Sequence, residues 1–273
     1  MDKSEITKNL AELAKTTAVL NRLLAEIGKL DNDRTKNIAS LQARIPKLDA
    51  CVEALRQIPD VAKQLDEWLA NYRSEFVAFK EEQVKRFGVE LESELRKQGL
   101  ELSGHYPELR AGLFTFEINL DKWQITLWYG PKQERLGTCA VSAKETVELV
   151  EKSGTALGSH VEEAVFAQRL QESLTRLRLQ NEDGVIPIIA VLGELTLVMQ
   201  NERFRRDPRR EHYHSYGRAD FSMDLFHFGR RVQLRIATRS LVRSRDDFLW
   251  VPSDERSGEG AVYSHICLRK ETL

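Results

Sequence analysis

Residues 114–129 read FTFEINLDKWQITLWY, and this stretch decides how the second part of the chain is interpreted. Apolar and polar side chains alternate along it, which is the period-two pattern of a half-buried strand. A two-residue turn at Asp121-Lys122 would place the apolar side chains on one face of a hairpin. The pairs would be Leu120 with Trp123, Ile118 with Ile125, Phe116 with Leu127, and Phe114 with Tyr129. The sequence therefore predicts an antiparallel hairpin with one buried face.

The segment after the hairpin predicts a third strand and then several helices. The strand is expected at 136–141, after Gly130-Pro131. Two capping boxes, in which a Ser and a Glu three residues later satisfy free amides of a first helical turn, predict helices that start at Ser142 and Ser159. Residues 185–200 fit either a buried helix or a hairpin broken at Gly193, and their length favours a helix.

The C-terminal part of the chain has the alternation of a second meander of strands. A strand is expected at 219–225, followed by a Gly229-Arg230 turn in which glycine supplies the positive φ. Further strands are expected at 232–236, 248–251 and 262–268. Strands, then helices, then strands indicate an α+β domain with mainly antiparallel sheet.

Residues 1–100 have a helical pattern. Between residues 6 and 55, apolar side chains recur at steps of three and four, which is the register of a coiled coil. Polar residues interrupt it at Asp31-Asn32-Asp33, so residues 1–57 fit either one continuous rod or a helical hairpin that turns there. Pro46 and Pro59 indicate a kink and a restart. A third long helix is expected over 61–95, with an aromatic face wide enough to pack on a globular partner.

We therefore expect an α+β fold in two parts, a helical region at 1–100 and an α+β domain at 101–273. A coiled-coil seam needs cover from another apolar surface. On that ground we expect the helices of 1–100 to mediate a homo-oligomer or to dock on a protein partner.

Composition excludes several classes of protein. The 273 residues hold 41 basic and 42 acidic side chains, so net charge gives no argument for nucleic acid or membrane. The longest apolar run, 185–192, is too short to span a bilayer, and the N-terminus has no apolar signal region. The three cysteines are widely spaced and form no CxxC pair, at Cys51, Cys139 and Cys267. We expect a cytoplasmic protein that does not enter a membrane.

Residues 201–250 form the most unusual local feature, with twelve arginines, no lysine and seven acidic residues. Arginine binds phosphate or carboxylate with two parallel hydrogen bonds and stacks on rings. With His212, Tyr213 and Tyr216 nearby, the cluster at 203–210 suits DNA or RNA. The candidate nucleic-acid-binding residues are Arg203, Arg205, Arg206, Arg209, Arg210, Arg218, Arg230 and Arg231.

Two other interpretations compete with nucleic-acid binding in this segment. In the first, a structural one, the predicted hairpin places Asp224 opposite Arg235 and Asp220 opposite Arg239, as cross-strand ion pairs. In the second, His212-x-His214 joins Asp220 or Asp224 in a metal site, as in a metal-dependent nuclease. Two histidines at this spacing are common by chance.

The sequence contains no GxGxxG, Walker A, GxSxG or HExxH motif, so we expect neither an enzyme nor a bound cofactor. The function expected first is a non-enzymatic interaction or assembly subunit. A nucleic-acid-binding accessory protein that uses 203–210 is the alternative, and a metal-dependent nuclease is the second alternative.

Overall fold

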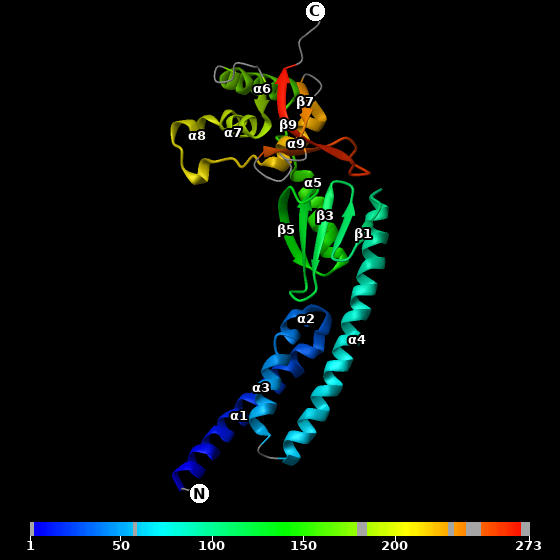
Figure 1. The fold of residues 1–273 in the computed structure, drawn as a ribbon, viewed down its shortest axis with the longest axis vertical. Coiled ribbons are helices and arrows are strands. Elements are labelled where there is room, and N and C mark those ends of the chain that lie inside the picture. Colours follow the sequence, from blue (N-terminus) through cyan, green and yellow to red (C-terminus); the bar gives the residue numbers. More distant parts are fainter. Residues whose placement is uncertain (1–2, 57–58, 179–184, 229–231, 239–246, 269–273) are drawn as a thin grey trace, which may run out of the picture. The chain divides into compact units, whose positions relative to one another are not determined.

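A computed structural model describes residues 3–56, 59–178, 185–228, 232–238 and 247–268 (Figure 1). The fold is α+β, as predicted, with helices first and antiparallel sheets after them. The chain forms two compact units. The first unit comprises Met1–Val89 with Leu120–Trp123, and the second comprises Glu90–Asn119 with Gln124–Leu273. The boundary between the units therefore falls within a helix, α4, as well as within the hairpin.

The first unit is helical. Its elements are α1 (Lys3–Leu30), η1 (Asp31–Asp33), α2 (Arg34–Gln42), α3 (Ile45–Leu55) and α4 (Pro59–Lys97). The chain turns back after α1 and α1 packs against α3, so the helical hairpin is the correct alternative and the rod is wrong (Figure 1). Asp33 caps α2 by accepting a hydrogen bond from the Lys36 amide. Pro46 lies in the first turn of α3, where its missing N–H costs no helical hydrogen bond.

The apolar seam of the first unit is covered by the chain's own helices. Leu20, Ile27 and Leu48 are at most 5% exposed, and α4 adds buried Tyr72 and Phe76 to the same unit. The Tyr72 hydroxyl donates a hydrogen bond of 3.0 Å to Oδ1 of Asp31, which joins α4 to the turn. The seam is thus no evidence for a second chain, and self-association through these helices stays a prediction.

The second unit begins with a five-stranded antiparallel sheet in the order β1-β2-β3-β4-β5. Its strands are β1 (Ser103–His105), β2 (Glu108–Ala111), β3 (Phe114–Asn119), β4 (Gln124–Tyr129) and β5 (Glu134–Ala140). The predicted register of the hairpin is confirmed, because Phe114 pairs with Tyr129, Phe116 with Leu127, and Ile118 with Ile125. Helix α5 (Ala143–Ala156) starts at Ser142, whose hydroxyl caps it as predicted.

A second group of helices and strands completes this unit. The helices are α6 (Glu163–Arg178), α7 (Ile188–Val198), α8 (Glu202–Arg206), η2 (Arg210–His212) and α9 (Arg218–Phe228). The strands are β6 (Ile186–Pro187), β7 (Val232–Ile236), β8 (Leu249–Pro252) and β9 (Gly260–Leu268), in the order β6-β9-β7 with β8 also paired to β9. The predicted helix within 185–200 and the three last strands are confirmed. Within the described residues, no helix combines the length and apolarity that crossing a bilayer requires.

Two predictions in this region are wrong. Residues 219–225 belong to helix α9 rather than to a strand, because that helix is buried on all sides and its apolar residues need not keep to one face. The buried side chains are Ala219, Phe221, Ser222, Met223, Asp224 and Leu225. Helix α6 begins at Glu163 rather than at Ser159, because the Ser159 amide instead donates to the Asp224 carboxylate.

A buried glutamine joins the first sheet to β8. Gln133 is 5% exposed and lies between β4 and β5. Its Oε1 accepts a hydrogen bond from the Trp250 amide, and its Nε2 donates to the Trp250 carbonyl at 3.2 Å. The side-chain amide thus pairs with a residue of β8 as the backbone of a neighbouring strand would.

Candidate functional site

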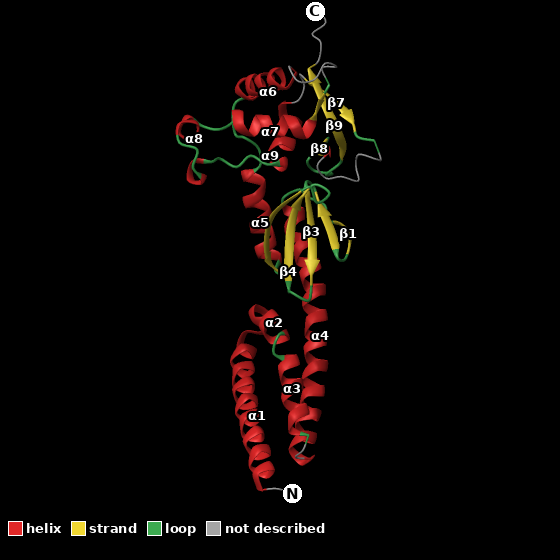
Figure 2. Ribbon diagram, turned by 60° about the vertical axis from the view of Figure 1, so that its left-hand side comes forward, coloured by secondary structure: helices red, strands yellow, loops and turns green. Residues whose placement is uncertain are grey.

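The predicted arginine cluster lies on one long connection between α7 and α9. We call residues 201–213 the arginine loop; it carries α8 and η2. Figures 1 and 2 both show this loop standing out from the helices and strands of the second unit. It holds five of the predicted candidates, Arg203, Arg205, Arg206, Arg209 and Arg210.

The base of the arginine loop is closed by Gln200, which is 3% exposed. Its Nε2 donates to the carbonyl of Thr196 at 2.8 Å and to that of His214 at 2.9 Å. Its Oε1 accepts from the His214 amide at 2.9 Å. The Thr196 hydroxyl adds a hydrogen bond to the carbonyl of Tyr216. The two ends of the loop are therefore fixed to the end of α7.

The loop also has contacts of its own. The rings of Phe204 and Tyr213 pack edge to face, with centroids 5.6 Å apart. Asn201 caps α8 by accepting from the Phe204 amide, and Nδ1 of His212 lies 2.9 Å from the carbonyl oxygen of Asp207. These contacts give the loop a defined shape.

The five arginines of the loop differ in what they contact. Arg205 donates to the Val198 carbonyl at the end of α7. Arg206 pairs with Glu202 at 3.0 Å, and Arg209 pairs with Asp207 at 2.9 Å. Arg203 and Arg210 are exposed, and among the described residues neither has a polar partner. These two guanidinium groups are the ones available to a partner.

The other candidates do not join the loop. Arg218 is the first residue of α9, and its Nη1 donates to the Phe248 carbonyl at 2.8 Å. This arginine is therefore engaged by the folded body of the unit. Arg230 and Arg231 lie outside the described residues, as do Arg239 and the predicted Gly229-Arg230 turn.

The predicted cross-strand ion pairs are wrong, and so is the placement of both aspartates on a strand. Asp224 is 2% exposed and accepts hydrogen bonds from the Tyr216 hydroxyl at 2.7 Å and from the Ser159 amide. Asp220 accepts from the amides of Gly158 and Gly217. Burial raises the pKa of Asp220 above its ordinary value and raises that of Tyr216. These carboxylates fasten loops to α9.

The predicted metal site is not assembled. His212 lies in η2, where its ring contacts Asp207, and Asp220 and Asp224 are held by backbone amides. Among the residues that the structure describes, no group of three or more His, Cys, Asp and Glu side chains could hold a metal ion. The chemistry proposed for a metal-dependent nuclease therefore has no support here.

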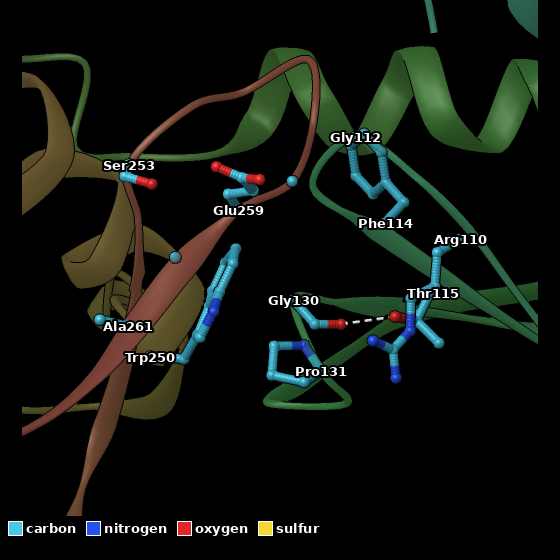
Figure 3. Close-up of a pocket in the computed structure, with 12 residues that line it drawn as sticks. Arg110, Gly112, Phe114, Thr115, Gly130, Pro131, Trp250, Ser253, Glu259 and Ala261 are labelled. Carbon is cyan, nitrogen blue, oxygen red and sulfur yellow. Dashed lines mark hydrogen bonds between the residues drawn. The ribbon is translucent and has the colours of Figure 1, made fainter. Parts of the chain in front are cut away.

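A cavity of about 470 Å³ lies elsewhere in the second unit, and sequence reasoning missed it. Figure 3 shows the indole of Trp250 on one side and Gly130, Pro131 and Arg110 on the other. The lining comes from β2 and β3, from the β4–β5 turn, and from β8 and β9. These residues fall in three segments, within 110–115, 130–131 and 250–261, and no sequence motif joins segments so far apart.

Comparison with protein-family models, with curated proteins and with solved structures finds no match to this chain.

Proposed function

We propose that this protein is a non-enzymatic interaction subunit and that the arginine loop docks on its partner. The observation that carries this proposal is the closure of the loop base by Gln200, together with the exposure of Arg203 and Arg210, which have no polar partner among the described residues. A loop with a fixed shape loses little conformational entropy on binding. Arginine and tyrosine are enriched at the centres of protein interfaces, and Tyr213 is 44% exposed here.

The charges of the loop favour a protein partner. Five arginines stand against three acids, and those acids lie among the arginines, as Glu202, Asp207 and Glu211. A phosphate backbone bound to this loop would meet carboxylates as well as guanidinium groups, and like charges oppose its binding. A protein surface can place a cation opposite each acid and an anion opposite each free arginine.

A nucleic-acid-binding function is the second candidate, and one observation favours it. Arg203 and Arg210, which have no polar partner in the described part of the chain, lie on the same loop as the exposed ring of Tyr213, and this combination suits phosphates and an unstacked base. Single-stranded DNA or RNA fits this arrangement better than a duplex does, because a ring can stack only on a base that is not paired.

The experiment compares the full chain with the double variant Arg203→Glu/Arg210→Glu. Proteins that co-purify with the tagged chain from its own cells are quantified by mass spectrometry, and binding to labelled oligonucleotides is measured over a salt series. The matched control is Arg22→Glu/Arg96→Glu, which reverses two charges of which 73% and 74% of the side chain is exposed. Both controls lie on helices away from the loop in sequence.

Each outcome decides between the candidates. Protein partners that are lost with the loop variant and kept with the control support the docking loop. Oligonucleotide binding that is lost only in the loop variant, and that weakens with salt, supports the nucleic-acid function. If the loop variant matches the unmodified chain in both assays, the arginine loop is not a docking element.

Self-association through residues 1–100 remains part of the proposal, as does a cytoplasmic location. The support for self-association is a set of exposed apolar side chains on α1 and α4, namely Val19, Trp68, Val77 and Val89. The three free cysteines suit a reducing compartment. Light scattering of the full chain tests the association, and a mass equal to one chain of 31.4 kDa at all concentrations contradicts it.

A further inference from the structure

Two glycines that line the cavity, Gly130 and Gly260, let the backbone approach the indole of Trp250 closely. Trp250 is 5% exposed and packs edge to face on Tyr129, with ring centroids 5.4 Å apart. A Cβ atom at Gly130 would lie 2.5 Å from Cε3 of the indole, and one at Gly260 would lie 2.7 Å from its Nε1. A larger residue at either position would therefore clash with the ring and would force it to move.

The indole N–H of Trp250 is a hydrogen-bond donor on one side of this cavity. Its Nε1 has no hydrogen-bond partner among the described residues. Although Trp250 as a whole is 5% exposed, this atom is not among the buried side-chain atoms that lack a partner, so it is accessible and a bound acceptor could take its hydrogen bond. Gly260, which leaves that N–H uncovered, also lines the cavity.

A cation lies on the opposite side of the same space. The Arg110 guanidinium donates to Glu108 through one of its nitrogens, at 2.8 Å, and its other N–H groups have no partner within the described part of the chain. Figure 3 shows Arg110 beside Thr115 and Pro131, across the cavity from Trp250. Glu259 also lines the cavity, but Figure 3 places its carboxylate near Ser253, on the side away from Arg110.

We propose that this cavity binds a small organic anion with a flat apolar body. Its acidic group would accept from Arg110, a second acceptor would take the Trp250 N–H, and its ring would lie among Phe114, Pro131 and the indole. A neutral hydrocarbon would leave both donors unpaired. The cavity volume lies in the range of about 300–1,000 Å³ that is usual for small-molecule sites. This site is independent of the arginine loop and goes beyond the function proposed above.

The experiment follows the indole N–H signals of the ¹⁵N-labelled full chain by NMR. The chain has four tryptophans, and the signal missing from a Trp250→Phe variant identifies that of Trp250. The probes are 4-hydroxybenzoate and 4-hydroxyphenyl phosphate, each of which carries an anionic group and a second acceptor on one ring, and 4-hydroxybenzyl alcohol, which lacks the charge. We expect the Trp250 signal to shift saturably with at least one anion, while the signals of Trp68, Trp123 and Trp128 stay in place.

Two variants test the role of the guanidinium. Arg110→Gln should weaken binding of the anion by about tenfold or more, because it removes a charge-assisted hydrogen bond. This variant is expected to fold, because 56% of the Arg110 side chain is exposed. The matched control, Arg135→Gln, changes an exposed arginine of β5 outside the cavity and should leave binding unchanged.

Three results would overturn the proposal. The first is a Trp250 signal that stays in place up to about 10 mM of both anions, a concentration at which even weak ligands bind. The second is binding of 4-hydroxybenzyl alcohol as tight as that of the anions. The third is an anion affinity that Arg110→Gln leaves unchanged.

Discussion

Replacement of Gln200 by alanine should open the base of the arginine loop without unfolding the second unit. The change removes two hydrogen bonds between Gln200 and His214, which close the base of the loop, and a third between Gln200 and the Thr196 carbonyl in the last turn of α7. Each such bond contributes about 0.5–1.5 kcal/mol net. Water can reach His214, which is exposed, and can pair again with its backbone groups. We therefore expect a cost near the lower end of the sum, about 2 kcal/mol.

The lost free energy opposes closure of the loop, because the two bonds to His214 hold its base together. A loss of about 2 kcal/mol raises the open fraction roughly 30-fold, since about 1.4 kcal/mol corresponds to a factor of ten. Hydrogen exchange measured by mass spectrometry should show this increase in peptides that cover residues 201–214, while peptides from α6 and α9 keep their protection. Trypsin should also cleave the variant faster after the loop arginines.

The control for this prediction is Gln168→Ala, which removes an exposed glutamine from α6 and should leave exchange in the loop unchanged. Two results would refute the reasoning. Loop exchange equal to that of the unmodified chain would mean that Gln200 does not hold the base closed. A uniform rise across the second unit would mean that the loop is not an independent element.

Three further predictions concern the packing and the electrostatics of the two units. Each is tested by the free energy of unfolding, measured in urea. Gly258→Ala should lower the free energy of unfolding by about 2 kcal/mol or more, because its φ of +67° and an adjacent backbone carbonyl both oppose a Cβ atom. Gly193→Ala is the control: this glycine has open space around it in α7, so the change should raise the free energy of unfolding by about 0.5–1 kcal/mol. Leu48 is 1% exposed in the first unit, and Leu48→Ala should lower the free energy of unfolding by about 2–5 kcal/mol. Val77 is 55% exposed, so Val77→Ala should lower it by less than about 0.5 kcal/mol. Burial raises the pKa of Asp220 in the folded chain above the ordinary value of 3.8. As the pH rises through 3.8, this carboxyl therefore ionises first in the unfolded chain. The free energy of unfolding then falls until the pH passes the pKa of the folded chain. The Asp220→Asn variant should lack this fall; parallel curves for the variant and the unmodified chain across that pH range would contradict the burial argument.

The hairpin at 114–129 could be predicted from the sequence to the residue because all of its determinants are local. Alternation sets which side chains share a face, and the turn at Asp121-Lys122 sets which of them pair. The cap at Ser142 is local in the same way. Elements of this kind depend on neighbouring residues only.

Helix α9 could not be predicted in this way. Apolar residues at 219, 221, 223 and 225 gave the alternation of a strand, yet the segment is a helix buried on all sides. A helix without a solvent face is free of the 3.6-residue period that would identify it. The burial of its second acidic residue, Asp224, depends on Tyr216 and Ser159, and Ser159 lies 65 residues away.

The surface that covers the apolar seam of the first unit could not be predicted either, because it too depends on contacts between distant segments. The apolar seam of 1–100 was visible in the sequence, but the surface that covers it was not. The structure supplies that surface from the chain's own helices. Similarly, the sequence placed the arginine cluster but could not show which of its members are engaged. Arg205 and Arg206 have partners, whereas Arg203 and Arg210 have none among the residues that the structure describes.

Gln133 and Gln200 each hold a distant residue through its peptide group alone, Trp250 in one case and His214 in the other. Such a contact does not depend on the side chain of the residue that it holds, because it is made to the backbone alone. The stretch between Gln200 and His214 can therefore be exchanged for another of equal span while both anchors persist. Such a graft would give the molecule a new recognition element on an unchanged scaffold, and the glutamine at position 200 is the residue the graft must retain.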